Sequence, residues 1–169
     1  MTIPASGLAG PTVRAMETGL ERHDIEDRED CERLVRVFYS RAMADPLIGH
    51  LFVDVAKLDL EAHVPTIASF WETVLLGAQT YRGGAFRPHA ELHQKAGLLA
   101  GHFERWLVLW NQTVDELFAG ERADLAKAHA LRVARAFHAR LQSFPSPSSP
   151  PPSEGGLPVL TVTRHGATG

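Results

Sequence analysis

Large apolar side chains recur every three or four residues between positions 103 and 117, and no other feature constrains the fold as strongly. The stripe consists of Phe103, Trp106, Leu107, Trp110, Val114 and Leu117. This period places all of them on one face of an α-helix of more than three turns. A helix with such a face needs other helices or a sheet to cover it, and no segment sustains the alternation of a strand. The sequence therefore predicts an all-α fold.

Two helices are predicted upstream of this stripe. An acidic run, Asp24–Asp30, precedes a helix expected over about Asp30–Met43, because negative charge favours a helix start. That helix must stop before Pro46, which disfavours helical geometry in the residue ahead of it. A second helix is expected to follow Pro65, since proline suits a first helical turn, and to end at Gly77.

Three more helical segments complete the predicted bundle. A glycine-containing loop leads into a short helix that carries His89 and His93 on one face. Gly120 is predicted to close the helix with the 103–117 stripe. A last helix with a narrow stripe of small residues is expected from about Arg122 to Leu141.

The composition of the two ends predicts one globular domain between flexible segments. Residues 1–25 mix Gly, Pro, Thr and charged residues without a period, which indicates a flexible arm. The stretch SFPSPSSPPPSEGG, which begins at Ser143, is too rich in proline for helix, so 144–169 is expected to be a disordered tail. The globular domain is then residues 26–143, a length that suits one core.

Charge and cysteine content limit the partners and the compartment. The formal net charge is -3, which predicts no attraction to nucleic acid or to an anionic membrane. Cys31 is the single cysteine, so no intramolecular disulfide can form and a reducing compartment is expected. The N-terminal residues lack the apolar core of a secretory signal, and no stretch reaches the length of a membrane span. We therefore expect a cytoplasmic protein.

Nine histidines raise the possibility of a metal site. His89 and His93 are four residues apart and could share a zinc ion if a third ligand joined them. The zinc-protease pattern H-E-x-x-H is not met, because Glu91 stands one position too late. No convincing ligand spacing involves His50, His102, His129 or His138, and these residues receive no functional prediction.

Eight large aromatic residues of the predicted helices and the loops between them could converge on one core: Phe38, Tyr39, Phe52, Phe70, Trp71, Phe103, Trp106 and Trp110. Periodicity alone allows two interpretations: a helical core without a cofactor, or a pocket that holds one.

Four segments in order resemble the third group of truncated haemoglobins: VFYSRAMADPLIGHLF, HVPTIASFWETVLLG, YRGGAFRPH and HFERWLVLWNQTVDELF. The resemblance covers about residues 30–140. It implies a truncated globin, in which two pairs of helices form a 2-over-2 sandwich around haem b. The helix over Asp30–Met43 would be the B helix, the one after Pro65 the E helix, the His89 segment the F helix, and the last two the G and H helices.

The same resemblance implies a set of haem contacts. His89 matches the proximal iron ligand, although it lies farther from Trp106 in sequence than is usual, and His93 is kept as the alternative. Tyr39, His63 and Trp106 match distal positions, and whether His63 gates the pocket or ligates the iron is left open. The remaining implied contacts are Phe38, Phe52, Ile67 and Phe70.

A five-coordinate haem iron with a polar distal pocket would bind oxygen, NO, CO or peroxide. Tyr39 and Trp106 as hydrogen-bond donors would slow oxygen release, which suits bulk oxygen transport poorly. The resemblance therefore favours redox chemistry, such as NO dioxygenase or peroxidase-like activity, with a reductase as a partner. A gas sensor or oxygen store is the alternative, and a cofactor-free helical interaction module a further one.

Overall fold

The computed structural model describes residues 22–144, and every regular element in this range is helical. In chain order the elements are α1 (Arg28–Ala44), the single π-helical turn η1 (Leu51–Val55), α2 (Leu60–Leu76), α3 (Phe86–Ala96), α4 (Ala100–Leu117) and α5 (Glu121–Leu141). The all-α prediction is confirmed for this part of the chain, although η1 was not foreseen. The N-terminal arm over 1–21 and the tail over 145–169 lie outside the described residues.

The first helix, α1, forms where the acidic run predicts it. Asp27 is its N-cap, and the carboxylate accepts a hydrogen bond from the Asp30 N–H (3.0 Å). The helix ends at Ala44 because Asp45 is extended ahead of Pro46. One face of α1 is buried in the core, and Phe38 on that face is fully buried.

The prediction that the second helix follows Pro65 is wrong, because α2 begins at Leu60 and contains that proline. Asp59 starts the helix, and its carboxylate accepts a hydrogen bond from the Ala62 N–H (3.2 Å). Pro65 removes one backbone donor in the second turn, while its own carbonyl accepts a bond from Ser69 Oγ (2.8 Å). Gly77 ends α2 in the left-handed conformation (φ 72°), as predicted.

Gly120 begins α5 and does not close α4, which ends at Leu117 with Phe118 as its extended cap. Gly120 has φ 148°, and a Cβ there would lie 2.4 Å from the Asp24 carboxyl carbon. The Asp24 carboxylate accepts hydrogen bonds from the N–H groups of Arg122 and Ala123 (both 2.9 Å). Gly120 is the N-cap residue of α5 and has no side chain that could accept these bonds. Asp24, from a distant part of the sequence, caps the helix instead.

Residues 22–25 were assigned to the flexible arm by composition, but the structure packs them onto the helices. Ile25 is fully buried, and the His23 ring contacts Phe118 edge-on (5.5 Å between centroids). The domain thus starts earlier than residue 26. Composition misses this because one apolar residue among charges carries no periodic signal.

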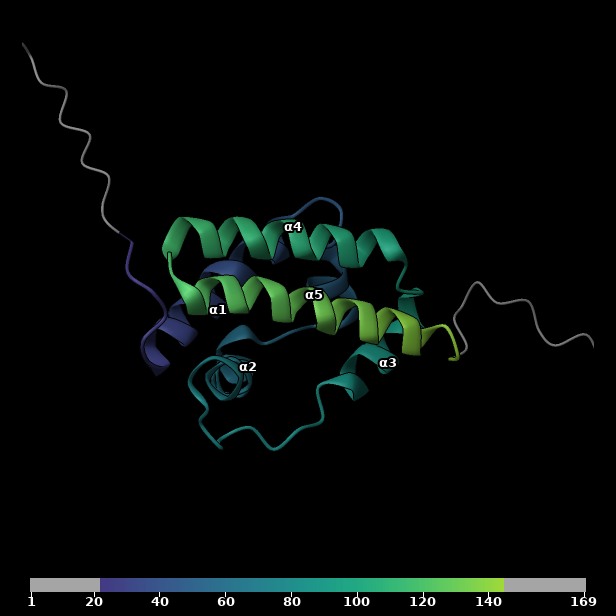
Figure 1. Cartoon of the computed structure of the whole chain (residues 1–169). Helices are drawn as coiled ribbons and strands as arrows, with labels where there is room; N and C mark the ends of the chain where they lie inside the picture. Colours follow the sequence, from purple (N-terminus) through teal and green to yellow (C-terminus); the bar gives the residue numbers. More distant parts are fainter. Residues whose placement is uncertain (1–21, 145–169) are drawn as a thin grey trace, which may run out of the picture.

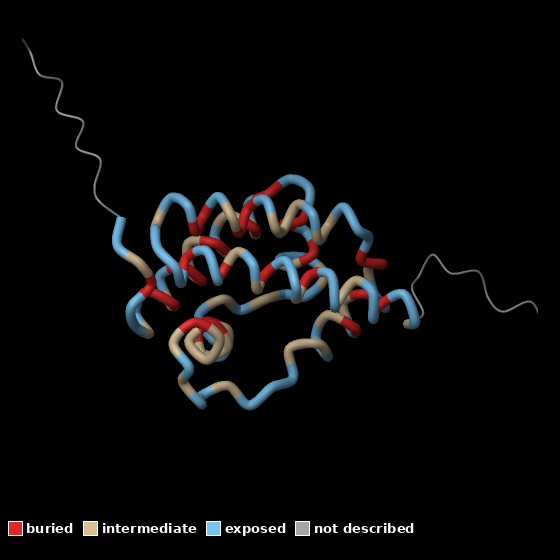
Figure 2. The backbone as a smooth tube through the Cα atoms, viewed as in Figure 1, coloured by how far each residue is buried: buried red, intermediate tan, exposed pale blue. Residues whose placement is uncertain are grey.

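The helices pack as two pairs, with α3 at the side (Figure 1). α1 packs against α2 and α4 against α5, while α1 also contacts α4 and α2 contacts α5. The positions of buried residues gather along the sides of the helices that face one another (Figure 2). Trp110 and Phe38 are the largest fully buried residues there. α3 contacts only η1 and α5 extensively, so it borders a space that the two pairs leave open.

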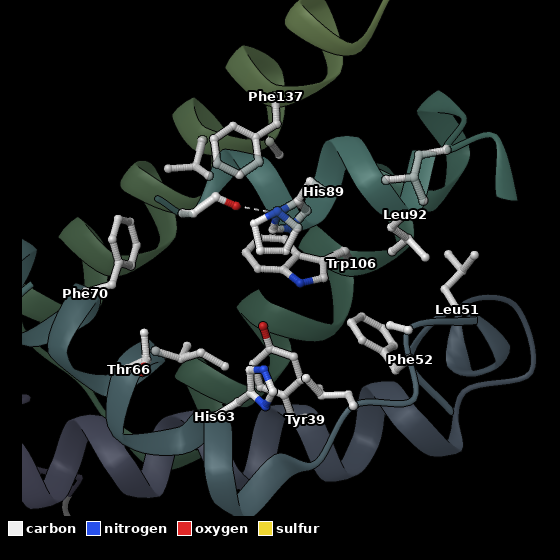
Figure 3. Close-up of a pocket in the computed structure, with 18 of the residues that line it drawn as sticks. Tyr39, Leu51, Phe52, His63, Thr66, Phe70, His89, Leu92, Trp106 and Phe137 are labelled. Carbon is white, nitrogen blue, oxygen red and sulfur yellow. Dashed lines mark hydrogen bonds between the residues drawn. The ribbon is translucent and has the colours of Figure 1, made fainter. Parts of the chain in front are cut away.

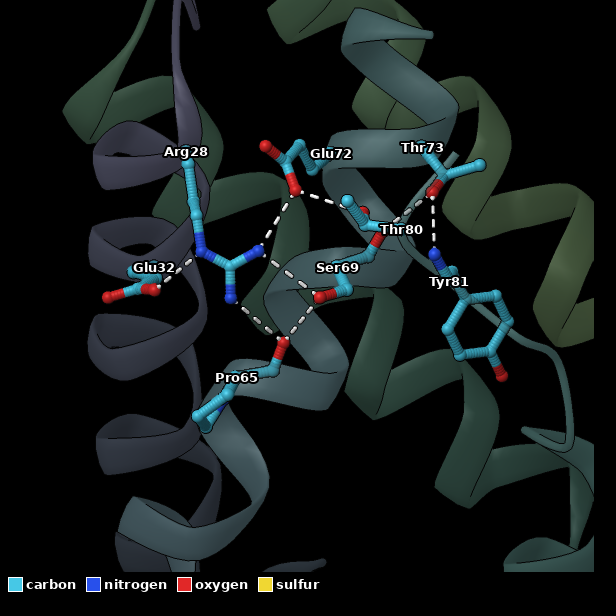
Figure 4. A network of polar contacts seen from close by, with 8 residues as sticks. All are labelled: Arg28, Glu32, Pro65, Ser69, Glu72, Thr73, Thr80 and Tyr81. Atoms are coloured by element: carbon cyan, nitrogen blue, oxygen red, sulfur yellow. Dashed lines mark hydrogen bonds and ion pairs between the residues drawn. The ribbon is translucent and has the colours of Figure 1, made fainter. Parts of the chain in front are cut away.

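A polar network joins α1, α2 and the loop after α2 (Figure 4). Arg28 Nη1 donates to Glu72 Oε2 (2.9 Å), and the Thr80 hydroxyl donates to the same oxygen (3.0 Å). The Tyr81 N–H in turn donates to Thr73 Oγ1 (3.3 Å). These bonds hold the start of the loop against α2, and this loop leads directly to α3.

Asp45 links the end of α1 to α4. The carboxylate is 4% exposed and accepts from Arg105 Nη2 (2.7 Å) and Nε (2.9 Å), and from the N–H of Leu47 (3.0 Å). The hydrogen bonds from the Arg105 guanidinium hold the pKa of Asp45 below its usual value, although burial acts in the opposite direction.

We expect Asp45→Asn to lower the free energy of unfolding by roughly 1–3 kcal/mol at pH 7, because several hydrogen-bond donors lose a charged acceptor that is itself buried. The folded-state pKa is depressed, so this stabilisation is present above about pH 4 and is lost as the pH falls through the folded-state value. Urea unfolding at pH 7 and pH 3 tests this. Glu91→Gln, which breaks the exposed pair with Arg87, is the control and should cost at most about 0.5 kcal/mol. Equal losses at both pH values would contradict the assignment.

Candidate functional site

A cavity of about 320 Å³ lies between α2, α3 and the α4–α5 pair, with residues of α1 and η1 completing its wall (Figure 3). Most of the wall is apolar, including Leu51, Phe52, Ile67, Phe70, Leu92, Phe103 and Phe137. The polar groups are few: Tyr39, His63, Thr66, Tyr81, His89, His102 and the Trp106 indole. Every haem contact implied by the resemblance lines this cavity, except Phe38.

His89 enters the cavity from α3 and is fixed by a backbone hydrogen bond. Its Nδ1 bonds the Ala85 carbonyl (2.8 Å), which only accepts, so Nδ1 carries the proton. In the neutral ring Nε2 then has a free lone pair. Burial lowers the pKa of His89, which favours this neutral form. Phe137 of α5 packs edge-on against the ring (4.8 Å between centroids) and supports its orientation.

His93, one turn along α3, is placed differently. Its side chain is buried (6% exposed) but is not part of the cavity wall, and its Nδ1 has no hydrogen-bond partner. Leu92 occupies the cavity wall at this end of α3. The helix thus presents only one of its two histidines to the cavity.

Tyr39 and His63 lie together on the side of the cavity opposite His89 (Figure 3). Burial raises the pKa of Tyr39 to about 12, so its hydroxyl keeps its proton and remains a donor at neutral pH. The Tyr39 ring is held edge-on between Phe38 (5.0 Å) and Phe52 (5.7 Å). His63 is exposed in the first turns of α2, and its Nδ1 bonds the Asp59 carbonyl (2.7 Å).

Trp106 places an indole N–H donor on the α4 side of the cavity. Its ring stacks on Trp110 (5.6 Å between centroids, 3° between planes) and meets Phe38 edge-on (5.3 Å). Phe38 therefore lies behind Tyr39 and Trp106, in the core, and does not line the cavity. It sits on the buried face of α1, whereas Tyr39, the next residue, turns toward the opening.

Sequence reasoning missed three polar wall residues: His102, Thr66 and Tyr81. His102 had a usable signal, because it precedes Trp106 by four residues on the same helix and so shares its face. Its Nδ1 accepts a hydrogen bond from the Leu99 N–H (3.1 Å). Tyr81 had no such signal, because it follows α2 in an irregular loop whose path depends on the network around Glu72.

Two further observations concern metal and membrane features of residues 22–144. No cluster of three or more His, Cys, Asp or Glu side chains is arranged there to hold a metal ion, so His89 and His93 lack a third protein ligand. None of the helices in the same range combines the length and apolar character needed to cross a membrane.

Comparison with known proteins gives a structural match and no sequence match. No protein-family model matches the chain, and neither does any curated protein. The structure is similar to the crystal structure of a group III truncated hemoglobin from Campylobacter jejuni, with a TM-score of 0.63. The sequence identity is 24%, and the match covers 71% of this chain and 94% of the other. The chain has a truncated-globin fold.

The elements follow the order that the resemblance implies. The assignment of α1, α2 and α3 to the B, E and F helices, and of α4 and α5 to the G and H helices, stays a prediction. The α1–α2 pair over the α4–α5 pair is the 2-over-2 sandwich. His89 approaches the cavity from α3, and Tyr39 and His63 approach it from α1 and α2.

Proposed function

We propose that this truncated globin binds haem b and that His89 ligates the iron. The observation that carries the proposal is the hydrogen bond between His89 Nδ1 and the Ala85 carbonyl (2.8 Å), which leaves Nε2 as a lone-pair donor at the cavity. Neutral imidazole is a common iron ligand, and ligating histidines generally donate their other ring N–H to a carbonyl or carboxylate. His93 has neither the supporting bond nor a place on the wall.

The rest of the cavity suits a large planar cofactor. Its volume of about 320 Å³ is within the usual range for ligand pockets, about 300–1,000 Å³. Phe52, Phe70 and Phe137 reach the wall from three different parts of the chain and offer aromatic surfaces to a macrocycle. The unpaired imidazole nitrogen and the aromatic walls together support haem over a cofactor-free core.

When bound, the haem iron supplies an open coordination position for oxygen, NO, CO or peroxide, together with the redox chemistry. The protein's own residues then orient the ligand. The Tyr39 hydroxyl, kept protonated by burial, and the Trp106 indole N–H both offer hydrogen bonds to a ligand with negative charge. The apolar wall limits competing water. This arrangement favours a retained ligand over a rapidly released one.

We propose redox chemistry on diatomic ligands or peroxide as the role, rather than bulk oxygen transport. A protein that holds its ligand firmly delivers it slowly but gives a second reactant, such as NO, time to meet it. Such turnover needs a reductase as a partner, to return ferric iron to the ferrous form. An oxygen store or gas sensor is the alternative, because the same two donors also serve retention alone.

Purification after expression with haem supplied tests the proposal. We expect a Soret band that shifts when CO is added to the reduced protein. A colourless protein that refuses added haemin would overturn haem binding. Mixing the oxygenated protein with NO then tests the role: rapid, stoichiometric nitrate formation supports an NO dioxygenase. Absence of nitrate together with no peroxide turnover would favour the store or sensor.

A further inference from the structure

The three tryptophans of the chain form one stack beside the cavity. Trp110 is the central member. Its ring stacks on Trp71 of α2 (4.3 Å between centroids, 20° between planes) and on Trp106 of its own helix (5.6 Å, 3°). Trp71 and Trp106 both line the cavity, whereas Trp110 is fully buried. The cavity wall is therefore continuous with an aromatic system that extends into the core.

Helix geometry explains only one of the two contacts in this stack. Trp106 and Trp110 are four residues apart on α4, so their side chains are neighbours on one helix face. Trp71 belongs to α2, whose backbone does not contact that of α4, so the long indole side chains alone make the contact between Trp71 and Trp110. The other aromatic pairs of residues 22–144 meet edge-on or tilted. Parallel overlap, which favours electron transfer between rings, is confined there to the tryptophans.

The surroundings of Trp110 suit the reversible loss of one electron. Its Nε1–H donates to the Ala126 carbonyl (3.3 Å), and an amide carbonyl is too weak a base to remove the proton. The oxidised ring therefore keeps its proton and can be reduced again without a proton transfer. Burial opposes a positive charge at this place, and the electron-rich faces of the two neighbouring indoles offset part of that cost.

One end of the stack lies close to the outer surface. Trp71 is 3% exposed, and the ring of His129 on α5 packs edge-on against it (6.0 Å between centroids). His129 is half-buried, so a single side chain separates Trp71 from solvent on this side. The other end, Trp106, faces the cavity. The stack thus joins the cavity to a surface site by rings in contact.

We infer that the tryptophan stack conducts electrons, one at a time, from a phenol-type donor at the His129 surface to the cavity during peroxide turnover. The inference rests on the proposed function. Peroxide takes up two electrons and two protons and forms two molecules of water. Two phenols each give up one electron and one proton and become phenoxyl radicals, so atoms and electrons balance. Within the chain, Trp106 gives an electron to the cavity and is refilled from Trp71 through Trp110.

The first test is electron paramagnetic resonance of the haem-loaded full chain, frozen rapidly after stoichiometric hydrogen peroxide is added without a donor. We expect an organic radical signal from tryptophan. Protein produced with ring-deuterated tryptophan should give a narrower signal, whereas ring-deuterated tyrosine should leave the signal unchanged. This comparison needs no substitution, so a folding defect cannot affect it.

Two variants then test the route. Trp110→Phe removes the central indole and should abolish most of the tryptophan signal, while Tyr81→Phe, which alters an oxidisable cavity residue outside the stack, should keep it. Trp71→Phe should keep a radical but slow its decay when p-cresol is added, because the surface end of the route is lost. A Soret band and a CO complex in each variant show that it has folded and loaded haem.

A signal that deuterated tryptophan leaves unchanged, or that persists in full in Trp110→Phe, would overturn the inference while leaving haem binding intact. Peroxide consumption without any protein radical would overturn it as well. An unchanged decay in Trp71→Phe would refute the entry of electrons at the His129 surface. Failure of the wild type to take up haem would instead refute the proposed function.

Discussion

Replacing His89 with alanine is expected to yield a folded protein that purifies almost free of haem. The affinity for haem should fall by more than about 100-fold. Mutating groups that only support a metal ligand already lowers metal affinity or activity by about 10–100-fold, and His89 is the proposed ligand itself. The ratio of Soret to protein absorbance after haemin titration measures this loss. Circular dichroism of the apoprotein checks that the helices remain, since His89 is only half-buried.

His93→Ala is the matched control for this experiment, since the residue lies on the same helix one turn away and is not part of the cavity wall. We expect it to retain haem and the same axial spectrum. The reverse outcome, with haem lost in His93→Ala and kept in His89→Ala, would show that the wrong histidine has been assigned. His89→Gly with added imidazole offers a rescue: a restored Soret band would attribute the loss to the missing ligand rather than to misfolding.

The second large effect concerns the rate of oxygen release from the ferrous haem protein. Tyr39→Phe removes a hydroxyl that burial keeps protonated, and Trp106→Phe removes an indole N–H. A hydrogen bond to a charged group contributes roughly 1.5–3 kcal/mol, which corresponds to about ten- to a hundredfold in rate for each variant. The double variant should release oxygen about two to four decades faster than the wild type. Stopped-flow replacement of oxygen by CO measures the rates.

Release of CO in the same variants is the control, because bound CO carries little negative charge and gains little from a donor. We expect CO release to change far less than oxygen release. Equal acceleration for both ligands would indicate a general opening of the cavity. An oxygen release rate that is fast in the wild type and unaffected by Tyr39→Phe would contradict the distal assignment.

Several features of the site were predictable from local sequence. The resemblance of four short segments to a known family implied a set of haem contacts. Of these, Tyr39, Ile67, Phe70 and Trp106 line one cavity, and their contact with haem stays a prediction. Phe38 does not, because adjacent residues on a helix point in different directions, and the partner helix decides which of the two reaches the opening.

The choice between His89 and His93 illustrates what spacing leaves open. The two residues share one face of α3, so either could meet an iron on sequence grounds. The position of α3 against η1 and α5 brings His89 to the cavity and leaves His93 in a buried site without a partner for Nδ1.

The sequence by itself determined the helical class, most helix ends and the residues available to the cavity, because periodicity and proline or glycine signals act over a few residues. Long-range contacts decided the rest. Asp24 caps α5 although most of the chain separates them. Only the tertiary structure could set this contact, since a hydrogen bond requires both partners within about 3 Å and local sequence does not bring together residues so far apart in the chain.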